Sequence, residues 1–196
     1  ITAAIFALAS LPTLLMLRER AVPQPVHTPR NAWRQVRHTL GHLSQLPDLK
    51  RFLICTVLYQ AGIQAVITLA AIYASQVFHF DTQRTIELVL VVNITAALGA
   101  FLFGYVQDRI GHVRSIALTL AGWIAMVLLA WMAPDERMFW VAANLAGLCM
   151  GASQSAGRAM VGLLAPPAHQ AEFFGLWGLA VKLASILGPL TYGAAS

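Results

Sequence analysis

Long apolar runs separated by short polar segments make up most of the chain. They cover residues 1–17, 52–78, 86–106, 115–133, 138–164 and 173–195. A helix crosses a bilayer with roughly 20 predominantly apolar residues, and each run is long enough once tilt is allowed. The pattern predicts an all-α, polytopic membrane protein with six transmembrane helices.

The long polar segment 18–51 is predicted to be a linker that contains a helix of its own. Its first part holds Pro23, Pro25 and Pro29, which favour an extended chain. Apolar residues then recur at helical spacing over about 31–46: Trp33, Val36, Leu40, Leu43 and Leu46. This amphipathic helix either lies on the cytoplasmic membrane surface or caps the cytoplasmic end of the bundle. The predicted organisation is one membrane helix (1–17), a cytoplasmic linker (18–51) and five further membrane helices (52–196).

The positive charge is concentrated in this linker. Seven of the 13 Lys and Arg residues lie in 18–51, and basic loops stay on the cytoplasmic side of a membrane. We therefore expect the segments around 18–51, 107–114 and 165–171 to face the cytoplasm. The chain is 58% hydrophobic and 11% charged, against about a quarter charged in soluble domains. The bilayer accounts for the net charge of +5 better than a nucleic acid does, so no nucleic-acid partner is expected.

Ionisable and amide side chains inside the apolar runs are the candidate pathway residues. A charge near the bilayer centre costs on the order of 3 kcal/mol. Lys182 lies about ten residues into the last run, so its position there must serve either function or structure. It either faces an aqueous cavity and binds a carboxylate, or forms a structural pair between helices. Arg158 either lines the same path or serves the cytoplasmic gate. The remaining candidates, for which helix–helix hydrogen bonding is the alternative role, are Gln154, Gln60, Gln64 and Asn93.

The sequence contains no arrangement of residues typical of an enzyme. We find no Walker loop, no paired carboxylates for acid–base chemistry and no cysteine spacing that suits a metal. All six histidines lie in predicted loops or at helix ends, whereas a membrane redox centre needs imidazole within the bundle. We predict no catalytic residue, no cofactor and no metal site.

The turn after the third run carries a specific motif. "GYVQDRIGHVR" (104–114) resembles the signature Gly-x-Leu-x-Asp-Arg-x-Gly-Arg-Lys of the major facilitator superfamily. Gly104, Asp108, Arg109 and Gly111 match it, while His112 and Val113 depart from its basic pair and Arg114 supplies a charge one place later. We expect Gly104 to allow tight packing, Gly111 to allow the reversal, and Asp108 to cap the next helix or pair with a basic group.

A narrower resemblance covers nearly the whole chain. "FALASLPTLLMLRER", "AAIYASQVF" and "GASQSAGRAMVGLLAPPAHQAEFFGL" are similar to the bacterial relatives of the autophagy-linked vacuolar amino-acid effluxers of yeast. One departure concerns residues 59–62, which read Tyr-Gln-Ala-Gly where those proteins read Tyr-Asn-Asp-Gly. The carboxylate is lost, so a coupling role at this position is not expected.

The resemblance implies a transporter half. The six runs would correspond to helices 6–11 of a major facilitator fold, in which two halves rock about a central site. Lys182 would bind an anionic group, the amides would shape the site, and Asp108 with Arg109 would belong to a cytoplasmic latch.

Two functions stay open. The first is secondary active transport of a small polar solute, with amino acids among the candidates. The second is a non-transporting scaffold or degenerate half that acts only as a self-assembled oligomer. Because the chain starts with Ile, we expect it to be part of a longer protein. The expected partners are the lipid bilayer, the solute, and the missing N-terminal half or a second copy of the chain. The expected location is a bacterial inner membrane.

Overall fold

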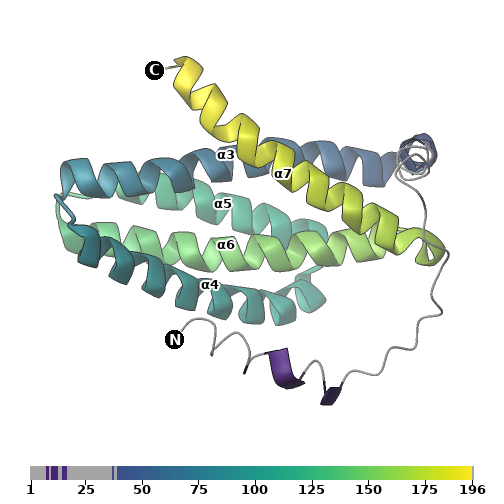
Figure 1. Ribbon diagram of the computed structural model, residues 1–196, viewed down its shortest axis with the longest axis horizontal. Coiled ribbons are helices and arrows are strands. Elements are labelled where there is room, and N and C mark those ends of the chain that lie inside the picture. The colour runs from purple at the N-terminus through teal and green to yellow at the C-terminus, as the bar shows by residue number, and fades with distance from the viewer. Residues whose placement is uncertain (1–7, 9, 13–14, 17–36, 38, 196) are drawn as a thin grey trace. The chain divides into compact units, whose positions relative to one another are not determined.

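A computed structural model describes residues 8, 10–12, 15–16, 37 and 39–195. The chain divides into two units, 1–35 and 36–196. The few described residues of the first unit are helical, and the rest of the predicted span 1–17 lies outside the described residues. The second unit contains α3 (Pro47–Val77), α4 (Thr82–Ile110), α5 (His112–Trp131), α6 (Glu136–Leu164), the short 3-10 helix η1 (Pro167–His169) and α7 (Gln170–Ala195) (Figure 1). The described ranges hold no strand, so the all-α class is confirmed.

Helices α4 and α6 begin before the apolar runs that predicted them, and an aspartate caps the start of each. The Asp81 carboxylate accepts a hydrogen bond from the backbone N–H of Arg84 at 2.8 Å and starts α4. Asp135 does the same for Met138 at 2.9 Å and starts α6. Such caps satisfy N–H groups that the first helical turn leaves without a partner. The apolar pattern therefore marks the lipid-length part of each helix rather than its ends.

Four helical segments are long and apolar enough to cross a membrane: α3, α4, α5 and 167–191. Six spans are not confirmed. α6 has the same length as α4, 29 residues, but it is not among the helices that are apolar enough to cross a membrane. Its middle is rich in glycine and polar residues, and it carries more buried residues than its neighbours, including Gly147, Ser153 and Gly157. A helix enclosed by other helices needs less apolar surface than one facing lipid, which accounts for the weak signal.

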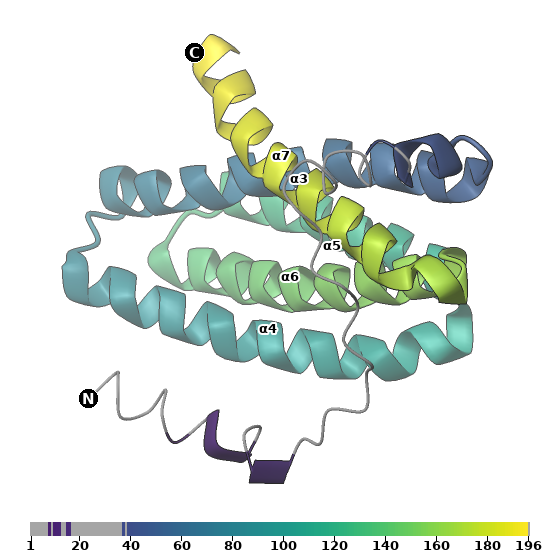
Figure 2. The same cartoon turned by 45° about the vertical axis from the view of Figure 1, so that its right-hand side comes forward.

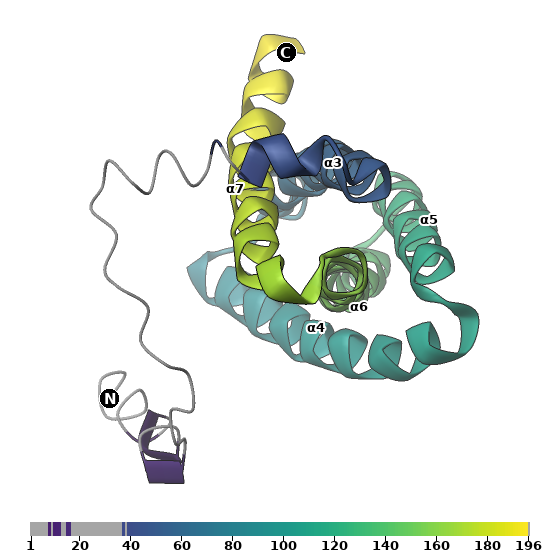
Figure 3. The same cartoon turned by 90° about the vertical axis from the view of Figure 1, so that its right-hand side faces the viewer.

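α6 is the central element of the bundle. It packs along α4 and α5 and also contacts α7 and α3 (Figures 1 and 3). At its crossing with α4 the backbones meet: a Cβ at Gly151 would overlap the Ala96 carbonyl, and one at Gly99 would overlap the Leu148 carbonyl. α3 and α7 form a second close pair of helices, in which Gly188 lies against Ala61 (Figure 2). Small residues thus set both close helix pairs, as they commonly do in membranes.

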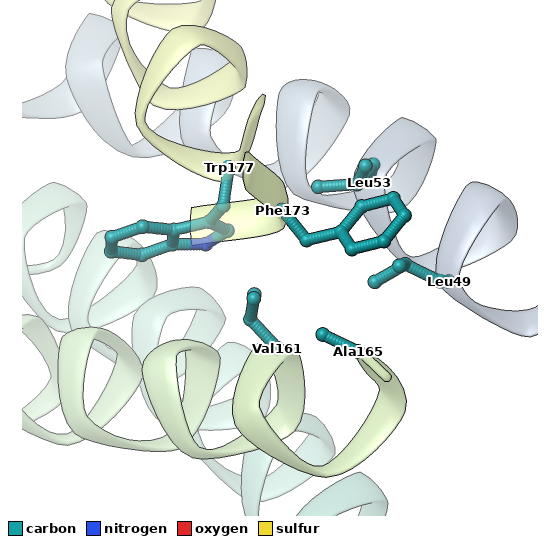
Figure 4. Close-up of a cluster of buried hydrophobic side chains, with 6 residues drawn as sticks. All are labelled: Leu49, Leu53, Val161, Ala165, Phe173 and Trp177. Atoms are coloured by element: carbon teal, nitrogen blue, oxygen red, sulfur yellow. The ribbon is translucent and has the colours of Figure 1, made fainter. Parts of the chain in front are cut away.

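Three apolar clusters stabilise the bundle along its length. One joins α3, α6 and α7 near the start of α7, where Phe173 and Trp177 lie between side chains of the other two helices (Figure 4): its members are Leu49, Leu53, Val161, Ala165, Phe173 and Trp177. A second joins α3, α5 and α6 and includes Ile63, Trp123 and Cys149. The third, with Phe80 and Phe139, lies where α3 and α5 end.

The linker helix is described only from residue 37, without 38. Residues 39–43 are helical and 44–45 form a turn, so the helix stops short of the predicted end at 46. Thr39 Oγ1 donates a 2.6 Å hydrogen bond to Glu172 Oε2, and the His42 ring stacks on His169 at 5.6 Å between centroids. These contacts hold the segment against the end of the bundle where α7 begins. They favour the capping interpretation over a helix lying free on the membrane.

Candidate functional site

One cavity of the described bundle is almost entirely apolar. It has a volume of about 540 Å³ and lies between the halves of α3, α4, α5 and α6 that meet near Phe139. Asn93 is the only predicted pathway residue that lines it, and its Nδ2 donates to the Val89 carbonyl of its own helix at 2.7 Å. An apolar cavity offers little to a polar solute, because it cannot replace the hydrogen bonds that the solute loses on leaving water.

A few polar groups lie beside the apolar cluster of α3, α6 and α7 that contains Trp177, at the junction of these helices. Gly157 of α6 lies at this junction: a Cβ there would be 3.4 Å from the Tyr59 hydroxyl of α3 and 3.7 Å from the Trp177 ring of α7. The next residue, Arg158, places its guanidinium carbon 5.7 Å from the centroid of the Trp177 ring. This is a cation–π contact, which lets a cation be partly desolvated without a carboxylate beside it. Arg158 itself is exposed.

Two further hydrogen-bond donors are buried, one on α3 and one on α7. Gln60 follows Tyr59 on α3 and is 1% exposed, and Trp177 is 9% exposed. Neither Gln60 Nε2 nor Trp177 Nε1 has a hydrogen-bond partner within the part of the chain that the structure describes. Buried polar atoms without partners are rare in proteins and call for an explanation.

The structure does not bring all of the predicted residues together. Arg158 lies at the junction, and the half-buried Gln154 lies one turn before it on the same face of α6. Gln60 and the half-buried Gln64 share one face of α3. Lys182 is exposed on α7, and five residues of helix turn it about 140° from Trp177. No ion pair of Lys182 occurs among the described residues. Asn93 lies elsewhere, on the apolar cavity.

Sequence reasoning missed Tyr59 and Trp177 as site residues. An aromatic residue in an apolar run looks like any lipid-facing or core side chain. The available signals were weak: Tyr59 precedes Gln60, and Trp177 stands between glycines at 175 and 178. Only the packing of three helices on Gly157 gives these aromatic residues a shared location.

The predicted motif turn joins α4 to α5. Gly111 is the residue between them and has φ +87°, so its expected role in the reversal is confirmed. The expected capping by Asp108 is wrong, because α4 continues to Ile110 and α5 starts at Gly111 without a side-chain cap. A Cβ at Gly104 would meet nothing within 4 Å, so the expected tight packing there is not found among the described residues. Asp108, Arg109 and Arg114 are all exposed.

No ion pair of Asp108 occurs within the described ranges. Around the same turn lie further buried atoms without a partner there, Gln107 Oε1, His112 Nδ1 and Ser115 Oγ. The described residues also contain no cluster of three His, Cys, Asp or Glu side chains that suits a metal ion.

Comparison with known proteins places the chain in a family. A model of the "Vacuole effluxer Atg22 like" family matches residues 1–196. An MFS-type transporter of Bacillus subtilis, YxiO, described as uncharacterized, is 25% identical over 191 residues, which is 97% of this chain and 44% of that protein. No solved structure matches.

Fungal proteins match as well. Autophagy-related protein 22 of Cryptococcus neoformans is 28% identical over 85% of this chain and 32% of its own length. Autophagy-related protein 22-1 of Penicillium rubens is 26% identical over 94% of this chain and 36% of its own length. The chain spans less than half the length of each of these relatives. Because the family model matches the whole chain, the chain belongs to the Atg22-like vacuole effluxer family of major facilitator transporters.

Proposed function

We propose that the protein containing this chain is a secondary transporter that moves a small polar solute across a membrane by alternating access. The observation that carries the proposal is the meeting of Tyr59, Arg158 and Trp177 around Gly157, where α6 packs against the apolar, membrane-length helices α3 and α7. Polar groups inside a membrane bundle are expensive, and they are found where a substrate path or a structural pair requires them. Membership of a family of effluxers supports the first of these two roles.

In this proposal the described helices form most of one half of the transporter. Gln60, Gln64, Gln154 and Arg158 line the path, Lys182 attracts an anionic group, and Asp108 with Arg109 serves a latch at the turn between α4 and α5. A transport path between two halves requires a second half, so the chain pairs with the rest of its own protein or with another copy. The similarity to a Bacillus subtilis protein supports a bacterial inner membrane as the location.

Flux measurements on the whole protein in liposomes test this proposal. We expect the wild type to move at least one small polar solute, with amino acids tested first, and Lys182→Gln to move it more slowly. Thr191→Ser is a conservative control on the same helix, since the Ser hydroxyl can also donate to the Gly188 carbonyl. Equal flux for wild type and Lys182→Gln would remove Lys182 from the path. Absence of flux for every solute would contradict transport and favour the scaffold.

Crosslinking of the protein in its native membrane tests the pairing. A single Cys placed on the exposed face of α4, for example at Phe101, should form products that contain another part of the protein or a second copy. Recovery of monomeric, uncrosslinked chain from every exposed position would contradict a two-half assembly.

A further inference from the structure

An apolar groove lies between the linker helix, α3 and α7. Its volume is about 240 Å³. Nine of its ten lining residues are Leu, Ile, Val or Ala, and the tenth is Lys50. We propose that this groove binds one molecule of an anionic phospholipid, with an acyl chain along the apolar lining and the phosphate beside Lys50. The proposal goes beyond transport and does not depend on the identity of any solute.

The apolar lining is open to the surroundings of the bundle. Ile54 of α3 and Leu179 and Leu183 of α7 are each about half exposed. They lie in segments that are long and apolar enough to cross a membrane, so side chains of this kind face hydrocarbon in a bilayer. An acyl chain in the groove contacts three elements at once. It therefore gains more van der Waals contacts than a chain that lies along a single helix.

The groove has the direction of a lipid molecule in a bilayer. Lys50 lies in the first turn of α3, and Val57 lies seven residues, about 10 Å, further along that helix. On α7 the lining extends over the same length, from Leu176 to Leu183. The single charged residue is thus at the end of the bundle where the linker joins it. The purely apolar part of the lining leads from there toward the middle of the membrane.

The charge at this end of the groove favours an anionic headgroup. Lys50 is exposed and forms no ion pair within the part of the chain that the structure describes. The nearby carboxylate of Asp48 lies 3.5 Å from Arg51 instead. Segment 18–51, which leads into α3, holds seven basic and two acidic residues. Basic clusters directly beside a membrane helix attract anionic lipids, and the ammonium group of lysine binds phosphate as a point charge.

The same lipid would connect the linker to the bundle. Leu40 and Leu43 of the linker helix line the groove, and Thr39 of that helix donates a hydrogen bond to Glu172 of α7. An acyl chain that contacts these leucines on one side and α3 and α7 on the other adds an apolar contact to this polar one. The lipid is therefore expected to stabilise the docked linker.

Photo-crosslinking locates the lipid on the whole protein in phosphatidylcholine nanodiscs. The probe is phosphatidylglycerol with a diazirine in one acyl chain, held at one low mole fraction. We expect adducts at 53–57 of α3 and 176–183 of α7. Added unlabelled phosphatidylglycerol should reduce them at least fivefold, and added phosphatidylcholine should not.

Two results of this measurement would overturn the proposal. Adducts of equal intensity on other exposed apolar positions, such as Phe101 of α4, with no effect of the competitor, would show ordinary contact with bulk lipid. Absence of adducts in the groove would show that another part of the protein or a second copy covers it.

Substitution of Lys50 tests the headgroup site. Lys50→Gln should raise the amount of phosphatidylglycerol needed for half competition by about fivefold, the factor that corresponds to one basic charge at a membrane surface. Arg51→Gln is the matched control, because Arg51 loses the same charge at the next position but lies beside Asp48 and does not line the groove. It should leave the competition unchanged. An equal change in the two variants would mean that general surface charge attracts the lipid, and would overturn the site at Lys50.

A polar substitution tests the acyl-chain site. Leu179→Gln places an amide in the apolar lining, and we expect it to reduce the groove adducts because the chain cannot satisfy the hydrogen bonds of that amide. Ile186→Gln is the control on the same helix, since Ile186 is also exposed but lies outside the groove. Equal adduct yields at α3 in the two variants would contradict a chain bound along Leu179.

Discussion

Thr39 and Glu172, which are 133 residues apart in the chain, are joined by a 2.6 Å hydrogen bond between Thr39 Oγ1 and Glu172 Oε2. The bond connects the end of the linker helix to the first turn of α7, and His169 lies 3.7 Å from the other carboxylate oxygen. The linker is therefore attached to the helix that carries Trp177.

Removing this hydrogen bond should loosen the linker. Thr39→Val keeps the shape of the side chain but cannot donate, and we expect it to lower the free energy of unfolding by about 1.5 kcal/mol, because bonds to charged groups are among the stronger ones. Equilibrium unfolding of the detergent-solubilised protein measures this loss of free energy. Thr68→Val is the control, since Thr68 is exposed and donates only to the Gln64 carbonyl of its own helix. A similar loss in both variants would contradict a special role for Thr39.

The crossing of α4 and α6 should not tolerate a side chain. In Gly151→Ala the new Cβ would overlap the Ala96 carbonyl and lie 2.8 Å from the Ala100 nitrogen, so the helices must separate. We expect a loss of about 1–3 kcal/mol in unfolding free energy, the usual cost of overpacking. Gly178→Ala is the matched control in another helix, where a Cβ meets nothing within 4 Å. It should be neutral or stabilising, because Ala favours the helix by up to about 1 kcal/mol.

The turn at Gly111 should require glycine. Its φ of +87° with ψ of 156° is a conformation that residues with a Cβ rarely adopt. Gly111→Ala should therefore destabilise the protein by about 1–3 kcal/mol. Gly104→Ala, seven residues earlier in α4 and with open space around it, should not. Thermal unfolding of the two variants in parallel tests this, and equal melting temperatures would show that the turn relaxes to an ordinary conformation.

Cysteine labelling should report the orientation of the bundle. With Cys55 and Cys149 replaced by Ser, Arg109→Cys in the last turn of α4 should react with a membrane-impermeant maleimide only from the cytoplasmic side. Arg137→Cys near the start of α6 should react only from the opposite side, because the two positions are at opposite ends of the bundle. Labelling of both positions from the same side would contradict the predicted topology.

The apolar pattern alone predicted much of the fold. Five of the six runs correspond to α3 through α7, and the motif predicts the turn that Gly111 makes with φ +87°. Helix formation and burial in lipid depend on local sequence, because a run of apolar residues must satisfy its backbone hydrogen bonds within the helix. The helix ends were less predictable, since single capping residues such as Asp81 and Asp135 set them.

The candidate site was only partly predictable. Gln60 and Arg158 could be found from sequence because a polar group within an apolar run is energetically costly wherever the helix packs. Their neighbours could not: Trp177, Tyr59 and Gly157 come from three helices that are distant along the chain. Lys182 was the strongest sequence signal, but the structure places it on an exposed part of α7.

Local physics therefore determined which segments are helices and which residues are costly to bury, whereas tertiary packing decided which of those residues share a site. The reason is that close van der Waals packing, rather than burial of apolar surface, drives helices together in a membrane. Which faces meet depends on where glycines such as Gly151 and Gly188 let backbones approach, and that depends on both partners at once. No single helix sequence carries that information, so the meeting of Tyr59, Arg158 and Trp177 around Gly157 exists only because α3, α6 and α7 pack together.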